Sequence, residues 1–385
     1  MSTLKNINLS AHFVLTLLLC CFCIATSSAA TKYVKPTGND SNNGNSWAQA
    51  YQTLQKALEA AAASGDEIWI AAGTYYPSKD ETGSASPSDN RKKVFYINKD
   101  VAIYGGFNGT ETARSQRNWN TNIVTLSGDI GTIGSSTDNC YHVVKIYNVS
   151  NAMTLNGVQI TGGNASASGS TADGIGGGII IQGTDGVSSS PLINNCRIYA
   201  NSASNGGGVG AFSLNNGSSI PDFFNCIIDN NNATGVAGGV YNFSDGNFMG
   251  TPFSVATFEH CTFYENNSVS STARVGYSFA ADDGGASLFI INSIAWGSAT
   301  GVYFSKSTFG ATHLQYSLSK GGCNGNTNCV GVILSSDPLF VNAAGGNLRL
   351  NASSPAIDVA GTEYFNSPSN VDYDNNPRPV GCTDY

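Results

Sequence analysis

The side chains best suited to chemistry lie in one short stretch of the sequence. Arg274, Tyr277, Asp282 and Asp283 all follow Asn266, in the longest interruption of a repeated pattern. A pair of carboxylates is the arrangement with which glycoside hydrolases protonate a leaving oxygen and activate water. Adjacent residues of a strand point to opposite faces, however, so this pair cannot act together on one bond. Asp282, Asp283 and Arg274 are therefore weak catalytic candidates, and a calcium-binding turn or a solvated loop is the alternative interpretation.

Proton abstraction by a lyase would instead need a base and cationic support for an acidic sugar. From Ile146 to Ser305 the only basic side chains are Arg197 and Arg274. Arg197 should point outward, because its neighbour Cys196 belongs to an inward-facing column. We take Arg197 and Tyr277 as weak candidates for ligand binding. This scarcity of charge favours a protein without catalytic activity.

Cysteines supply the next candidate chemistry. Cys196, Cys226 and Cys261 recur in copies of one motif, Asn-Cys-x-Ile or its variant His-Cys-x-Phe. Residues at equivalent positions of stacked strands form a line, whereas zinc needs ligands that converge tetrahedrally. A buried cysteine behaves as a small apolar side chain, so we expect a structural column and no metal site. A disulfide between two neighbours in the column is the alternative. Cys323 and Cys329, separated by a flexible loop, are expected to form a disulfide.

One acidic motif resembles the first half of a calcium-binding loop. Asp372 and Asp374 alternate with other residues up to Asn376, but Pro377 stands where such loops need glycine. No bidentate glutamate follows at the required distance. The motif is therefore expected to be a structural turn, with calcium only as a weak alternative, and no other cofactor is predicted.

The elements that position these residues are short strands bounded by Gly, Asn or Ser. Copies of the cysteine motif recur about every thirty to forty residues and alternate with glycine-rich elements such as Gly176-Gly177-Gly178. Such a period is the signature of stacked repeats. The fold class predicted is all-β, a right-handed parallel β-helix. Before the repeats, Leu54, Ala57, Leu58 and Ala61 form one apolar stripe of a helix that would cap the stack, with Thr53 as N-cap and Gly65 as its end.

Composition and the termini limit the remaining possibilities. The net charge of −8 over 385 residues offers no electrostatic basis for binding nucleic acid. Residues 1–30 combine Lys5, an apolar run and a small-residue site before Thr31, which predicts a signal peptide and export. The domains expected are this signal peptide, a capped β-helix over 31–334 and a C-terminal module over 335–385.

Several motifs resemble known families. The opening Tyr33-Val34-Lys35-Pro36 with Ser46-Trp47 is similar to that of secreted bacterial β-helix proteins of the pectin-lyase-like superfamily. The Asn-Cys-x-Ile and Gly-Gly-Gly repeats resemble those of polymorphic outer-membrane proteins. Three further motifs resemble a terminal module called choice-of-anchor Q. They are Ser336-Asp337-Pro338-Leu339-Phe340-Val341, Ser353-Ser354-Pro355-Ala356-Ile357-Asp358 and Asp372-Tyr373-Asp374-Asn375-Asn376-Pro377. Those modules continue past the equivalent of Tyr385, which implies a truncated module here.

The resemblance implies a fold and a location outside the cell, but not an activity, because one fold supports many functions. We expect an exported or cell-surface protein that binds glycans or host surfaces without turnover, in the manner of an adhesin. A polysaccharide lyase or glycoside hydrolase acting on an acidic polysaccharide is the alternative, and a structural stalk is the second. The expected partner is a polysaccharide or a cell-surface glycan, with no nucleic acid and no membrane span after signal cleavage.

Overall fold

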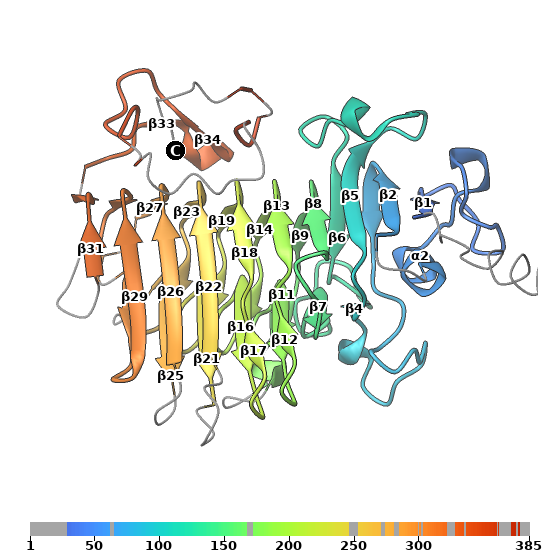
Figure 1. Cartoon of the computed structure of the whole chain (residues 1–385), viewed down its shortest axis with the longest axis horizontal. Coiled ribbons are helices and arrows are strands. Elements are labelled where there is room, and N and C mark those ends of the chain that lie inside the picture. Colours follow the sequence, from blue (N-terminus) through green and yellow to red (C-terminus); the bar gives the residue numbers. More distant parts are fainter. Residues whose placement is uncertain are drawn as a thin grey trace, which may run out of the picture.

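The chain folds into a right-handed parallel β-helix, seen from the side in Figure 1. This computed structural model describes residues 29–61, 65–167, 172–245, 253–270, 274–280, 285–298, 300–301, 303–321, 328–334, 336–359, 361, 371–374 and 376–377. The predicted signal peptide therefore lies almost entirely outside the described residues. No helix in the described part of the chain is long and apolar enough to cross a membrane.

Four parallel sheets, here named A to D, run along the solenoid. Sheet A contains β1 (Thr31–Val34), β2 (Glu67–Ala71), β5 (Ala102–Phe107), β8 (Thr154–Asn156), β12 (Ser188–Ser189), β13 (Leu192–Asn194), β17 (Ser218–Ser219), β18 (Asp222–Phe224), β22 (Phe253–Glu259), β26 (Gly285–Ile291), β29 (Gly310–Gln315) and β31 (Asn328–Val330). Sheet B contains β3 (Gly73–Tyr75), β6 (Val124–Ser127), β9 (Gln159–Thr161), β14 (Arg197–Tyr199), β19 (Ile227–Asp229), β23 (Thr262–Tyr264), β27 (Ile294–Trp296), β30 (Leu318–Ser319) and β32 (Ile333–Leu334).

The remaining two sheets complete each coil. Sheet C contains β4 (Phe95–Ile97), β7 (Val144–Tyr147), β11 (Ile179–Gly183), β16 (Val209–Ser213), β21 (Val240–Ser244), β25 (Gly276–Ala280) and β28 (Phe304–Lys306). The small sheet D contains β10 (Asn164–Ala165), β15 (Ser202–Ala203), β20 (Asn232–Ala233) and β24 (Asn267–Ser268). One full coil therefore passes through A, B, D and C before it returns to A.

The predicted cysteine column is confirmed. Cys196, Cys226 and Cys261 are free and buried at the corner between sheets A and B. The Sγ of Cys196 donates to the carbonyl of Asn194 at 3.1 Å, and the other two thiols bond the carbonyl two residues before them in the same way. Burial raises the pKa of Cys196 and Cys226, which keeps these thiols protonated.

A second interior column consists of asparagines at the end of each motif. The main-chain N–H of Asn201 donates to Oδ1 of Asn231 at 3.0 Å, and Nδ2 of Asn231 donates to Oδ1 of Asn266 at 3.0 Å. Each of these amides also donates to a main-chain carbonyl of the coil before it. The ladder satisfies polar groups that would otherwise be buried without partners.

The corners need backbone conformations that asparagine and glycine tolerate. Asn195, Asn225 and Asn292 all have φ near +50° at the A–B corner, as expected for the left-handed region. Within a glycine triplet, two positions need glycine for different reasons. Gly176 has φ +73, but a Cβ on the next residue, Gly177, would lie 2.2 Å from the carbonyl oxygen of Ser202. That second glycine is needed because the next coil approaches too closely for a side chain.

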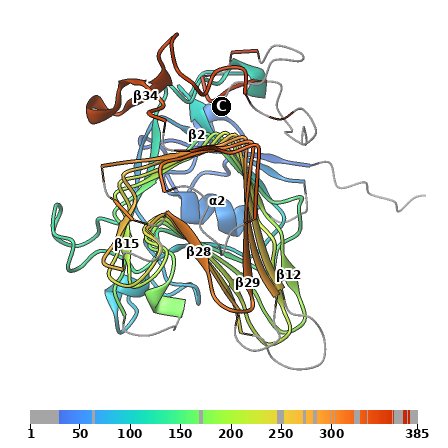
Figure 2. The same ribbon diagram turned by 90° about the vertical axis from the view of Figure 1, so that its left-hand side faces the viewer.

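The N-terminal end carries the predicted cap. Helix α2 (Leu54–Ala60) lies across the end of the solenoid in the end-on view of Figure 2, and its side chains Leu54, Ala57 and Leu58 are buried. Thr53 caps it by accepting a bond from the N–H of Lys56 at 3.2 Å. The helix ends at Ala60, before the predicted end at Gly65, because the chain at Ala61 is already extended.

The C-terminal residues leave the solenoid and lie against its outside. Strands β33 (Phe340–Asn342) and β34 (Asn347–Leu350) form an antiparallel pair beside the ends of the sheet B strands in Figure 1. Ala356, Leu350 and Phe340 pack against Ile294 and Leu318 of sheet B. We call residues 336–377, as far as they are described, the C-terminal segment.

Candidate functional site

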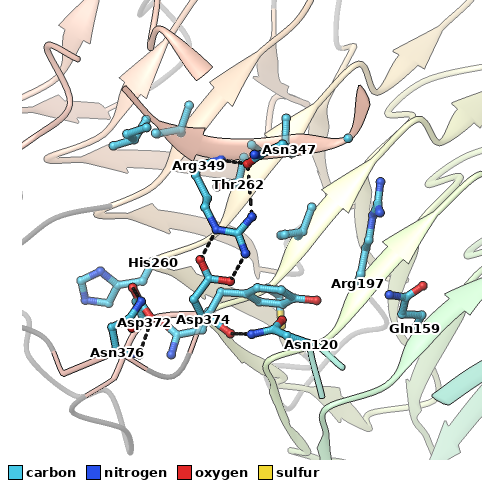
Figure 3. Close-up of a pocket in the computed structure, with 18 of the residues that line it drawn as sticks. Asn120, Gln159, Arg197, His260, Thr262, Asn347, Arg349, Asp372, Asp374 and Asn376 are labelled. Carbon is cyan, nitrogen blue, oxygen red and sulfur yellow. Dashed lines mark hydrogen bonds and ion pairs between the residues drawn. The ribbon is translucent and has the colours of Figure 1, made fainter. Parts of the chain in front are cut away.

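A pocket lies between the C-terminal segment and the outer face of sheet B. Its volume is about 560 Å³, within the usual range for small-molecule sites. Polar side chains contributed by both walls line it: Asn120, Gln159, Arg197, Asn225, His260, Thr262, Asn347, Arg349, Asp372, Tyr373, Asp374 and Asn376. Figure 3 shows Gln159 and Arg197 side by side on one wall, with the pair Arg349 and Asp374 facing them from the segment.

On the solenoid wall, Arg197 is fixed by a buried carboxylate. Its Nε and Nη2 donate to the two carboxylate oxygens of Asp229 at 2.8 and 2.7 Å, and the Asp229 side chain is only 1% exposed. This bidentate bond raises the pKa of Arg197. The guanidinium also lies 4.7 Å from the ring centre of Tyr199. Arg197 is therefore held rigidly, with its remaining N–H groups directed away from Asp229.

The opposite wall repeats this arrangement in a more exposed setting. Nε and Nη2 of Arg349 donate to the carboxylate of Asp374 at 2.6 and 2.7 Å, which raises the pKa of Arg349. Asp372 accepts bonds from the N–H and the amide of Asn376 at 2.8 and 3.1 Å. The motif from Asp372 to Asn376 is thus the structural turn expected from Pro377.

These pairings determine the charge of the pocket. Each arginine is neutralised by its own carboxylate, and Asp372 adds one more negative charge. Gln159 and Thr262 make no side-chain hydrogen bond within the described residues. They lie in one column of the same sheet face, with Arg197 and Ile227 between them. The pocket therefore offers amide and hydroxyl groups beside apolar side chains, without a net positive charge that would attract a polyanion.

Hydrogen bonds to the main chain hold the C-terminal segment in place. The indole N–H of Trp119 donates to the carbonyl of Tyr373 at 2.8 Å, and Nδ2 of Asn225 donates to the carbonyl of Val371 at 2.8 Å. Asn292 pairs with both main-chain groups of Gly361. Burial raises the pKa of the Tyr373 phenol beyond its ordinary range. The corner asparagines therefore serve both the bend of each coil and the attachment of the segment.

The structure does not gather the predicted site residues into one site. Arg197 lines the pocket and points outward as expected, but Arg274 and Tyr277 lie elsewhere. Arg274 donates to the carbonyls of Thr300 and Ser268 at 2.5 and 3.2 Å, so it fastens a loop. Tyr277, on the outer face of sheet C, lies parallel to Tyr241 with ring centres 6.2 Å apart.

Other predictions fall partly on residues that are not described. Asp282, Asp283 and Cys323 lie outside the described residues, so the carboxylate pair stays a prediction. Cys329 is disulfide-bonded, and its expected pairing with Cys323 stays a prediction. Among the described residues, no group of three or more His, Cys, Asp or Glu side chains could hold a metal ion.

Sequence reasoning did not recognise most of the pocket. Gln159 occupies the same column as Arg197, one residue after the inward-facing Val158, so the period of two could have found it. Tyr373 was recognised only as part of a terminal motif, and Arg349 carries no local signal of its own. Nothing in a local pattern brings either of them to sheet B.

Comparisons with known proteins concern the fold. No family model matches the sequence, and no curated protein matches it. Similar solved structures include pectate lyase Pel9A, with 14% identity and a TM-score of 0.47 over 92% of this chain and 97% of that chain. A rhamnogalacturonan lyase has 18% identity and a TM-score of 0.43, over 80% of this chain and 73% of that chain. The pectin methylesterase from Aspergillus niger has 14% identity and a TM-score of 0.38, over 81% and 88% respectively. At these identities the likeness assigns a role to no residue.

Proposed function

We propose that this protein is an exported, non-catalytic glycan-binding protein, and that its ligand site is the pocket between sheet B and the C-terminal segment. The observation that supports it is the pairing of both pocket arginines with carboxylates, beside amide and hydroxyl side chains that remain available. Such a surface suits a ligand rich in hydroxyl groups and without charge, because sugar hydroxyls both donate and accept hydrogen bonds.

The pocket chemistry also bears on the enzymatic alternative. A hydrolase of the two-carboxylate kind needs one acid and one base on either side of the scissile bond. Within the described residues, Asp229 and Asp374 are each engaged by an arginine, and Asp372 by Asn376. A carboxylate held in such a bond is poorly suited to proton transfer. The lyase or hydrolase and the stalk remain the alternatives that the experiment must separate.

The experiment is a glycan array followed by titration calorimetry with the best-bound oligosaccharide. Gln159→Leu removes the amide from the solenoid wall, and we expect its affinity to fall at least tenfold, about the loss expected for a hydrogen bond to a buried ligand. Gln52→Leu makes the same change at an exposed position near the cap helix. This control should bind as the unchanged protein does.

Turnover is measured on the same glycans and on pectin, alginate and glycosaminoglycans. Binding without new chain ends supports the proposal. Cleavage that Asp283→Asn abolishes would overturn it in favour of an enzyme. Failure of every glycan to bind, with a correctly folded protein, would favour the stalk.

A further inference from the structure

A second surface, on the opposite side of the corner, has a different chemistry from the pocket. Strands β22 and β26 are each seven residues long and β29 has six, so they are longer than their neighbours in sheet A. They pair one to one without a register shift, from Phe253↔Gly285 to Ile291↔Gln315. Figure 1 shows these three strands at the front of the solenoid, with no other element drawn across them. We call their outer side the sheet A face.

The outward side chains of this face form two aromatic rows with small residues between them. Phe253 and Phe309, which are 38% and 53% exposed, lie at one end of the strands. Phe289 and His313 lie four residues further along, with parallel rings whose centres are 4.3 Å apart. Ser287 and Ala311, paired across neighbouring strands, separate the two rows. At the strand rise of about 3.3 Å per residue, the rows lie roughly 13 Å apart.

The face also carries almost no charge. Between the two aromatic rows the outward residues are Val255, Ser287 and Ala311, and Thr257 lies in the row of Phe289. Glu259, the one acidic residue of these strands, is only 2% exposed. Partial burial lowers the pKa of His313, so that side chain is neutral at physiological pH. One carboxylate lies beside these groups, because Asp222 of the neighbouring strand β18 is paired with Thr257. The face therefore presents hydroxyl and aromatic groups next to a single negative charge, which disfavours an anionic partner.

We propose that the sheet A face binds an extended, uncharged polysaccharide. Apolar faces of sugar rings pack against aromatic side chains, while Thr257 and Ser287 can bond their hydroxyls. The distance between the aromatic rows exceeds one sugar ring, so the face recognises a run of several units rather than a single sugar. This site is separate from the pocket, which lies on sheet B, and it does not depend on the function proposed for the pocket.

The size of the face argues against a protein partner. Three strands at a spacing of about 4.8 Å and seven residues in length present an area of roughly 330 Å². A stable protein–protein interface usually buries about 800 Å² on each partner. A second copy of this chain would therefore need contacts well beyond the uncharged region. A polysaccharide chain needs no such area, because it can lie along the face.

The test measures retention on insoluble cellulose and chitin and affinity for soluble, uncharged β-glucan oligosaccharides of increasing length. Phe253→Ala combined with Phe309→Ser removes the exposed aromatic row, and we expect at least tenfold weaker binding. Ser287→Arg places a long cation between the rows and should weaken binding similarly. Both changes are on the outer surface, so the melting temperature checks that the fold is intact. Tyr76→Ala, at another exposed aromatic, is the matched control.

Each outcome is decisive. Affinity that rises with oligosaccharide length, and falls in both face variants but not in Tyr76→Ala or Gln159→Leu, supports the proposal. Unchanged binding in both face variants overturns it. Stronger binding to oligogalacturonate than to uncharged glucans overturns the ligand class. A dimer in light scattering that the face variants dissociate would show that a second copy covers the face.

Discussion

The interior columns and the pocket are built on the same repeats, but they rely on different contacts. The columns use contacts between adjacent coils, whereas the pocket uses contacts between residues far apart in the sequence. Asn201, Asn231 and Asn266 bond each other across one coil, at sequence separations of 30 and 35 residues. The pocket wall depends on Trp119 and Tyr373, which are 254 residues apart, and on Asn225 and Val371, 146 apart. Repetition alone can specify the first kind of contact, because each coil contacts its neighbours. The second kind is specific to this chain.

The largest effect should come from breaking the interior ladder. Asn231→Ala removes the acceptor of the Asn201 N–H and the donors to Ile198 and Asn266, and leaves buried polar groups without partners. We expect a loss of roughly 4 kcal/mol in the free energy of unfolding, measured in urea. Asn232→Ala, at the exposed next residue, should cost less than about 0.5 kcal/mol. Equal losses in the two variants would mean that the ladder is not what stabilises the coils.

An intermediate effect should appear only in acid. Burial lowers the pKa of His142 to about 4, while Asp173, with Oδ1 3.9 Å from its Nε2, opposes that shift. The unfolded chain takes up this proton near the ordinary pKa of about 6.5, so it binds more protons than the folded state between these values. Stability should therefore fall as pH drops from about 6.5 to about 4, by up to roughly 3 kcal/mol.

The control for this prediction is a change of the histidine itself. His142→Gln keeps a polar side chain near the carbonyl of Gly176, which Nδ1 of His142 contacts at 2.9 Å. Urea unfolding across the pH range should then show a shallower acid slope than in the unchanged protein. An identical slope in both proteins would show that protonation of His142 is not what lowers the stability in acid.

The smallest effect should come from the attachment of the C-terminal segment. Trp119→Phe removes the donor to the carbonyl of Tyr373 and should weaken this attachment by about 1 kcal/mol, with little change in overall stability. Amide hydrogen exchange in residues 371–377 should become faster. Trp47→Phe, which removes an equivalent bond to the carbonyl of Glu111, is the matched control and should leave that exchange unchanged.

The sequence was sufficient for the parts of the fold that repeat. The period of two placed the cysteines inside and Arg197 outside, and the left-handed corners agree with the asparagines that begin each motif. The inward asparagines were not predicted. A polar side chain is expected on the outside of a narrow solenoid unless its buried hydrogen-bond partners are known, and the sequence does not show them. Asp229 could have been found, since aligning the repeats of Cys196 and Cys226 places it one coil from Arg197.

The candidate site was much less predictable. The interrupted repeat drew attention to Arg274 and Tyr277, but an interruption shows only that a loop is longer, not that its residues converge. The pocket depends on where the C-terminal segment lies after it leaves the solenoid. Its attachments use main-chain carbonyls of Val371 and Tyr373, which no side-chain pattern reveals.

Those main-chain attachments have a consequence for how such a protein can change its ligand. Trp119 and Asn225 hold the carbonyls of the C-terminal segment, and neither bond depends on the side chains at the attached positions. Substitutions in the segment can therefore alter the groups that face the pocket while the segment keeps its place. Arg197 is fixed by Asp229 and has no such freedom. One wall of the pocket is thus free to vary in sequence, while the other is constrained by its own buried ion pair.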